Sequence, residues 1–155
     1  MKLKLIAVAA AVAFSGAAYA QKDDAARKAK DQEEERIEQQ AKADKERCNA
    51  MEGNAKDVCN AEAKGKEKVA KAELDAKYDN SPANQRKVAE AKLNAEYDVA
   101  KERCESQKGD AEDQCEKAAK DKRDMARKQV REQYAKQPER PAATGATGRT
   151  QPPAK

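Results

Sequence analysis

One pattern occurs twice in the sequence, as KERCNAMEGNAKDVC at residues 45–59 and as KERCESQKGDAEDQC at residues 101–115. In each stretch two cysteines enclose ten residues, and a glycine lies at the same place with a small polar residue directly after it. Glycine adopts the left-handed conformation that often ends a helix, and Asn or Asp often caps the next one. Each stretch therefore predicts a reversal between two helices. The predicted turn and cap residues are Gly53, Asn54, Gly109 and Asp110.

The chain has four cysteines, all of them in these two stretches, and their even number predicts two structural disulfides in an oxidising compartment. Pairing Cys48 with Cys59 would staple two adjoining helices near their joint. Cys104 and Cys115 would do the same at the second turn, and duplication of the turn as a unit favours this local pairing. The crossed alternative joins Cys48 to Cys115 and the two inner cysteines to each other. It stays open, because all four cysteines lie at one end of the predicted arrangement.

The first 20 residues, MKLKLIAVAAAVAFSGAAYA, have the pattern of a secretory signal peptide. A positive start is followed by a short apolar run and by the small-x-small cleavage site Ala18-Tyr19-Ala20. The apolar run is too short to cross a bilayer, which takes about 20 apolar residues. We predict a cleaved signal peptide at 1–20 and a mature chain that starts at Gln21 and carries no transmembrane span. The predicted location is the periplasm, with the extracellular space as the alternative.

Charge is balanced over the body of the chain. The sequence holds 33 basic and 29 acidic residues. Two basic residues lie in the leader, and the tail at 138–155 holds three basic residues and one acidic residue, so residues 21–137 hold 28 of each sign. Nucleic-acid binding depends on a clustered positive surface. The balance therefore argues against a nucleic-acid partner.

The composition favours long helices. Strong helix formers such as Ala, Lys, Glu, Arg and Gln dominate the body, and large apolar residues are few. We predict an all-α chain of up to four long charged helices in disulfide-stapled antiparallel hairpins that run up and down in turn. A compact bundle and extended hairpins both fit this pattern. The first predicted helix covers 22–47 and stops near 51–54, and the others span 55–79, 82–108 and 111–137. The Pro-, Gly- and Thr-rich tail at 138–155 is predicted to be disordered.

The repeat extends beyond the cysteine turns, since Lys45–Tyr78 aligns with Lys101–Tyr134 without a gap at an offset of 56 residues. Three predicted helices also share an alanine, a large apolar residue and a tyrosine at i, i+4 and i+8, along one side of a helix. In an antiparallel hairpin around Ser81, the ring of Tyr97 is expected opposite Gly65. The predicted packing stripe is Leu74, Tyr78, Leu93, Tyr97, Val130 and Tyr134.

Enzyme chemistry finds no support in the sequence. The chain has no histidine and no close cysteine pair, so the usual zinc ligands and a redox-active CxxC motif are both missing. There is no nucleophile motif and no glycine-rich phosphate loop, and so small a core is not expected to desolvate a carboxylate and shift its pKa. We predict a non-enzymatic protein without cofactor or metal.

A family resemblance is carried by the run GNAKDVCNAEAKGKEKVAKAELDAKY and by the later run VAEAKLNAEYDVAKERC. The chain resembles small exported Ala/Lys/Glu-rich helical proteins of betaproteobacteria with duplicated Cys turns, some of which are labelled cell-envelope or TolA-like. The resemblance covers about residues 45–120, and the second turn departs from the family pattern at Asp110, Glu112 and Gln114. It implies an exported helical protein with paired cysteines and brings no activity.

These features predict a non-enzymatic structural or interaction protein of the periplasmic cell envelope. Its exposed charged faces would contact other envelope proteins or further copies of the chain. The alternative is a stress-related, chaperone-like holdase that binds unfolded proteins in an Ala- and Tyr-lined groove between the hairpins. Both hypotheses concern binding and not catalysis.

Overall fold

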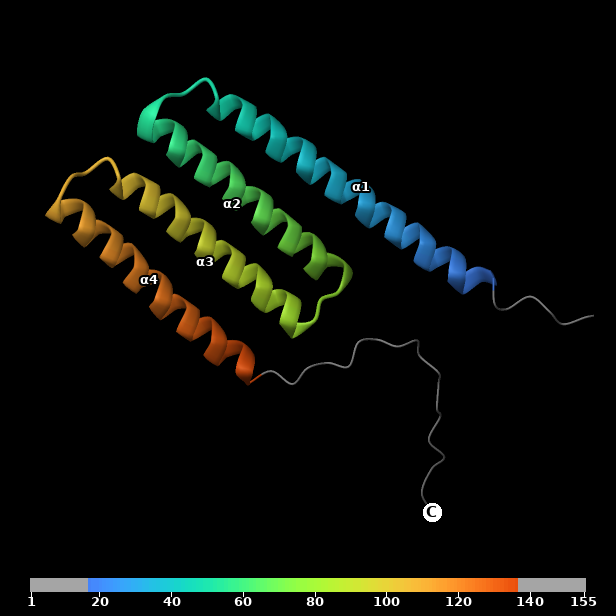
Figure 1. Cartoon of the computed structure of the whole chain (residues 1–155). Helices are drawn as coiled ribbons and strands as arrows, with labels where there is room; N and C mark the ends of the chain where they lie inside the picture. Colours follow the sequence, from blue (N-terminus) through green and yellow to red (C-terminus); the bar gives the residue numbers. More distant parts are fainter. Residues whose placement is uncertain (1–16, 137–155) are drawn as a thin grey trace, which may run out of the picture.

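The protein is all-α over residues 17–136, the part of the chain that its structure, a computed structural model, describes (Figure 1). Side chains are described from residue 24 on. The helices are α1 (Ala17–Cys48), α2 (Gly53–Tyr78), α3 (Pro82–Cys104) and α4 (Asp110–Ala135). The predicted fold class is confirmed. The predicted tail and most of the predicted signal peptide lie outside the described residues.

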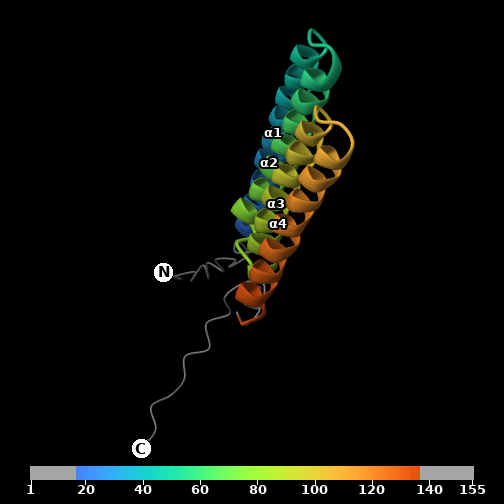
Figure 2. The same cartoon turned by 90° about the vertical axis from the view of Figure 1, so that its left-hand side faces the viewer.

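The four helices form one open layer. Each helix runs antiparallel to the next, and the helices lie side by side in chain order in Figure 1, while Figure 2 shows the same layer from its edge. Within the described residues, α1 contacts only α2 and α4 contacts only α3. The predicted hairpins are therefore arranged as a row and not as a closed bundle. None of the described helices combines the length and apolar character that a membrane span requires.

The core of this layer is small. In the described part of the chain, the buried apolar residues are Ala41, Cys48, Ala63, Leu74 and Cys104. Apart from the leucine these side chains are short, so little apolar surface is removed from water. A folded domain normally buries its apolar surface between two packed layers of elements. A single row of helices leaves both of its broad faces uncovered.

A disulfide joins the two helices at each predicted reversal. Cys48 bonds to Cys59, with 5.5 Å between their Cα atoms. Cys104 bonds to Cys115 with the same separation, and both bonds lie at one end of the layer. The local pairing is confirmed, and the crossed pairing is not formed. Closing each short loop stabilises the fold by about 3 kcal/mol in the chain-entropy model, which is a large share of the stability of a small domain.

The turn glycines have the predicted positive φ, 56° at Gly53 and 61° at Gly109, but they lie at the start of the second helix of each turn and do not end the first. The predicted caps after them need correction. α2 already begins at Gly53, so Asn54 lies inside the first helical turn, and Asp110 is the first residue of α4. An N-cap side chain reaches the N–H groups of the first turn only from a residue outside the helix. Asn54 instead donates a hydrogen bond from its amide to the carbonyl oxygen of Glu102 in α3.

The helices before the two turns end earlier than predicted. α1 ends at Cys48, where the Met51 amide donates to the Cys48 carbonyl oxygen at 3.0 Å. α3 ends at Cys104, where the Gln107 amide donates to the Cys104 carbonyl oxygen at 2.8 Å. The disulfides hold both helix ends close to the following helix. Each turn therefore includes residues that the composition assigned to a helix.

The α2–α3 hairpin forms as predicted, with a shifted contact. Ser81 caps α3, its hydroxyl oxygen accepting a hydrogen bond from the Asn84 amide at 3.3 Å. Gly65 faces Ala95, and a Cβ atom at Gly65 would lie only 2.8 Å from the Cβ of Ala95. The expected contact of Gly65 with Tyr97 is wrong, because the Tyr97 ring packs against α4. The helices approach most closely where both have minimal side chains.

Candidate interaction groove

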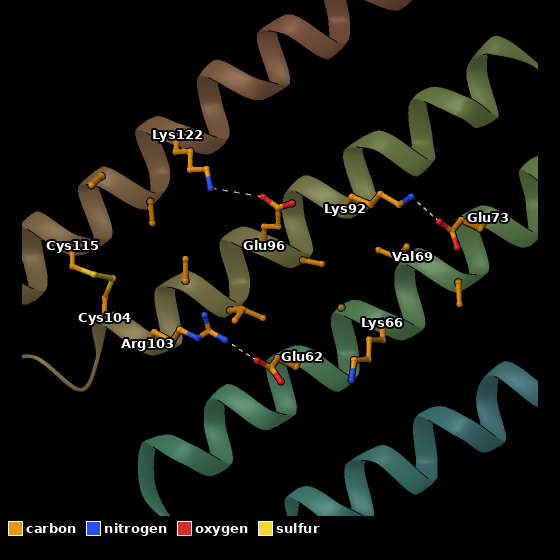
Figure 3. A pocket seen from close by; sticks show the side chains of 17 residues that line it. Glu62, Lys66, Val69, Glu73, Lys92, Glu96, Arg103, Cys104, Cys115 and Lys122 are labelled. Atoms are coloured by element: carbon orange, nitrogen blue, oxygen red, sulfur yellow. Dashed lines mark hydrogen bonds and ion pairs between the residues drawn. A yellow bond between two sulfur atoms is a disulfide. The ribbon is translucent and has the colours of Figure 1, made fainter.

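A broad groove of about 1150 Å³ crosses one face of the layer over α2, α3 and α4 (Figure 3). Its floor consists of small apolar side chains. They include Val69 of α2, Ala95 and Val99 of α3, and Ala118 and Ala119 of α4. Side chains this short do not fill the space between neighbouring helices. The groove is therefore a consequence of alanine and valine at positions where larger residues would close the surface.

Charged side chains line the rim, and most of them are paired between helices (Figure 3). The pairs are Glu62–Arg103 at 2.9 Å, Glu73–Lys92 at 2.7 Å and Glu96–Lys122 at 4.0 Å. Exposed ion pairs contribute only about 0.2–1 kcal/mol each. Lys66 of α2 also lines the rim and has no ion-pair partner among the described residues. The rim thus carries both signs of charge and one unpaired cation.

The opposite face of the layer is polar. Between α2 and α3 it is lined by side chains that include Asp57, Asn60, Lys64, Asp98 and Lys101. At about 100° per residue, these positions project from the sides of α2 and α3 opposite to the groove residues. Over α2 and α3 the layer is therefore amphipathic, with an apolar floor on one face and mostly charged and amide groups on the other.

The apolar face continues from the groove toward α1. Lys66 and Ala70 also line a smaller hollow of about 380 Å³, whose other side includes Ile37 and Ala41 of α1. Ala41 is buried there, whereas Ile37 remains half-buried. The surface that carries the groove therefore extends over all four helices.

Glu33 and Glu102 lie outside the groove and have pKa values shifted in opposite directions. Burial, together with the negative charge of Glu105, raises the pKa of Glu102 on the polar face. Hydrogen bonds from Lys77 and Tyr78 lower the pKa of Glu33 on α1. Neither glutamate lies in the groove. Among the described residues, no group of three or more His, Cys, Asp or Glu could hold a metal ion.

The predicted packing stripe does not form one surface. Leu74 is buried, whereas Tyr78 is exposed and donates a hydrogen bond from its hydroxyl to Glu33 at 3.1 Å. Tyr97 packs against α4, where the Arg123 guanidinium carbon lies 4.0 Å from the ring centroid. The remaining stripe residues, Leu93, Val130 and Tyr134, are half-buried. No tyrosine lines the groove, so its lining is rich in alanine but not aromatic.

Sequence reasoning missed the groove residues, among them Lys66, Val99 and Ala118. A signal was present, since small residues recur at helical spacing, as at Ala95 and Val99 of α3. The same spacing describes any side of a helix that packs against a neighbour. Periodicity alone therefore does not reveal which side of the layer is left uncovered.

Comparison with known proteins finds no protein family, no curated protein and no solved structure that matches the chain. The interpretation of the groove rests on its own geometry.

Proposed function

We propose that the protein is a non-enzymatic structural or interaction protein of the cell envelope, whose groove over α2, α3 and α4 binds helical segments of partner proteins. The observation that carries this proposal is the difference between the two broad faces. One face has an apolar floor within a groove of about 1150 Å³, and the other is polar. A contiguous apolar surface on a water-exposed protein commonly marks an interaction site.

The proposed location is the periplasm, reached through a signal peptide at 1–20 that is cleaved before Gln21. Two features support export. The leader combines a positive start, an apolar run and a small-x-small site. The mature chain carries two disulfides, which persist in oxidising compartments.

A helix is the partner element that suits this groove. Helices pack by placing the side-chain ridges of one into the grooves of another, and small side chains let the backbones approach closely. The floor residues Ala95, Val99 and Ala118 leave such a depression between α3 and its neighbours. An amphipathic helix would fill it with residues spaced at i, i+3, i+4 and i+7. The rim charges would then fix its orientation.

A photo-crosslinking amino acid placed in the groove tests this proposal in cells that export the chain. Ala118 is an exposed position on the groove floor, and Lys64 is an exposed position on the polar face. We expect discrete adducts with a few envelope proteins from position 118, identified by mass spectrometry, and few adducts from position 64. Equal adducts from both positions, or none from position 118, would contradict the proposal.

A holdase is a second candidate, favoured by the apolar and open floor of the groove. It would bind segments of many unfolding proteins and suppress their aggregation at a stoichiometric ratio. Small floor side chains such as Ala95 and Ala118 offer little apolar area to an irregular client, so the geometry favours a helical partner. Failure to suppress the aggregation of an unfolding client protein would remove the holdase.

A further inference from the structure

We propose that the groove binds a second copy of this chain, so that two layers pack face to face as a dimer. This inference rests on the function proposed above, because it assigns an occupant to the same groove. Two observations carry it, namely the incomplete core of the single layer and the arrangement of charge on the groove rim.

The single layer leaves apolar side chains without cover. Leu74 is buried, but Val69 and Val99 are only half-buried along the groove. Met125 follows Lys122 by three residues on α4, on the same side of the helix, and is 64% exposed. Domains normally bury such side chains between two layers of elements. A second copy over the groove would supply the missing layer.

The charges on the rim suit a copy of the same surface. Along α2 the rim residues are Glu62, Lys66 and Glu73, and along α3 they are Lys92, Glu96 and Arg103. The signs thus alternate on both helices, and in opposite order. A partner of one uniform charge would be repelled by part of this rim. A second copy carries both positive and negative side chains along its own rim, so opposite charges can face each other across the interface. Lys66 is available for a pair with a carboxylate of the second copy.

The free edge of α4 is less suited to a second copy. Lys117 and Asp121 lie two residues to either side of Ala119, and therefore on the side of α4 away from α3. Their side chains are 76% and 52% exposed, and they pair with each other at 2.7 Å. Packing a helix on this edge would remove both charges from water, which is costly. On the groove face the charged side chains lie at the rim, and the floor between them is apolar.

Sedimentation velocity of the oxidised mature chain, from micromolar to submillimolar concentration, measures the dimer. Lys66→Glu and Lys64→Glu are a matched pair, because both lysines are exposed on α2 and neither has an ion-pair partner among the described residues. Lys66 lies on the groove rim and Lys64 on the polar face. We expect a wild-type dimer whose dissociation constant rises about tenfold with Lys66→Glu and changes less than about twofold with Lys64→Glu.

A second pair of variants introduces bulk. Ala118→Arg places a long charged side chain on the groove floor, and Ala43→Arg places the same side chain at an exposed alanine of α1 outside the groove. We expect Ala118→Arg to leave only monomer and Ala43→Arg to dimerise as the wild type does. Circular dichroism spectra and thermal midpoints check that both variants keep the monomer fold.

A chain that stays monomeric at submillimolar concentration would overturn the dimer. So would a dimer that Lys64→Glu weakens more than Lys66→Glu, or one that Ala118→Arg leaves intact. A monomer that still crosslinks other envelope proteins from position 118 overturns the dimer and keeps the proposed function. A dimer whose position 118 crosslinks only to its own copy supports the dimer and removes binding to other proteins.

Discussion

The two helices that follow the stapled turns, α2 and α4, have aligned sequences but different surroundings. α2 packs between α1 and α3, whereas α4 has α3 as its one neighbour among the described helices. On the side that faces α3, α2 has Gly65 and, one turn before it, Ala61. At the aligned positions 56 residues later, α4 has Lys117 and Asp121, which pair with each other at 2.7 Å.

This difference shows how one helical pattern serves as an interior element or as an edge. Small residues such as Gly65 admit a neighbouring helix at close range, as the position of Ala95 demonstrates. A hydrated charged pair at the same positions disfavours a further hairpin, because packing would desolvate it. The row of helices therefore ends at α4, and the broad face is left for the proposed association.

Removing one disulfide should reveal the largest difference in stability between α2 and α4. Replacing Cys104 and Cys115 by alanine is expected to lower the free energy of unfolding by about 3 kcal/mol. It should also release α4, which has one neighbour, while α2 stays packed between two. Urea denaturation measures the first effect, and hydrogen exchange of α4 against α2 amides measures the second. Equally fast exchange in both helices would contradict the interior and edge roles.

A large side chain on the side of α2 that faces α3 should have the next largest effect. Gly65→Leu is expected to cost about 2 kcal/mol, because even a Cβ atom at Gly65 would lie 2.8 Å from the Cβ of Ala95. The aligned control, Asp121→Leu, should stay within about 0.5 kcal/mol on the open edge. Thermal and urea unfolding measure both. A similar loss in the two variants would show that α4 has a neighbour on its outer side.

The two cation–π contacts should contribute unequally to stability, because one is more buried than the other. Arg123 lies 4.0 Å from the Tyr97 ring centroid with its side chain 19% exposed, and Lys77 lies 5.6 Å from the Tyr78 centroid with its side chain 59% exposed. We expect Arg123→Gln to lower the free energy of unfolding by about 1 kcal/mol and Lys77→Gln to lower it by less. Arg123→Lys, which keeps the charge, is the control and should recover part of the loss.

The pH dependence of two glutamates should give the smallest effects, of opposite sign. The pKa of Glu33 is lowered from 4.5, so its stabilisation is present above pH 4.5 and is lost as the pH falls through the lowered value. The pKa of Glu102 is raised from 4.5, so its penalty is absent below pH 4.5 and sets in as the pH rises through the raised value. At pH 7, Glu33→Gln should lower the thermal midpoint and Glu102→Gln should raise it.

Both differences should shrink as the pH falls below 4.5, because protonation of the carboxyls removes the charge on which each effect depends. Thermal midpoints of the two variants and the wild type at several pH values provide the measurement. A change of the same sign in both variants at pH 7 would show that the neighbours of these groups are not those that the structure gives.

The reversals and the disulfide pairing could be predicted from the sequence because they depend on local chemistry. A glycine such as Gly53 and two cysteines at a short fixed spacing leave few arrangements. The surroundings of Tyr97 and Asn54 could not be predicted in the same way. Helical periodicity gives the side of the helix on which Tyr97 lies, but not whether α2 or α4 covers that side. The sequence predicts Asn54 as a cap, but in the structure the left-handed glycine before it is already the first residue of the helix.

The open layer and its groove were harder to predict for a related reason. Short loops between amphipathic helices are equally consistent with a closed bundle and with a row of hairpins. The choice depends on which alanines face a neighbour, and residues such as Ala95 and Ala118 look alike in both arrangements. The charged pair of Lys117 and Asp121, aligned with Ala61 and Gly65, was the one sequence feature that distinguishes an edge helix from an interior one.

The position of the disulfides also determines how the molecule would respond to tension. α1 begins and α4 ends at the same end of the layer, opposite to both bonds (Figure 1). A pull on these two ends would peel α1 from α2 and α4 from α3 turn by turn, as a zipper opens, until it reached Cys48 and Cys104. There a covalent bond stops the separation. The cysteines of each bond are 11 residues apart, so each bond withholds about 35 Å of chain from extension, and the oxidised molecule stretches less far than the reduced one.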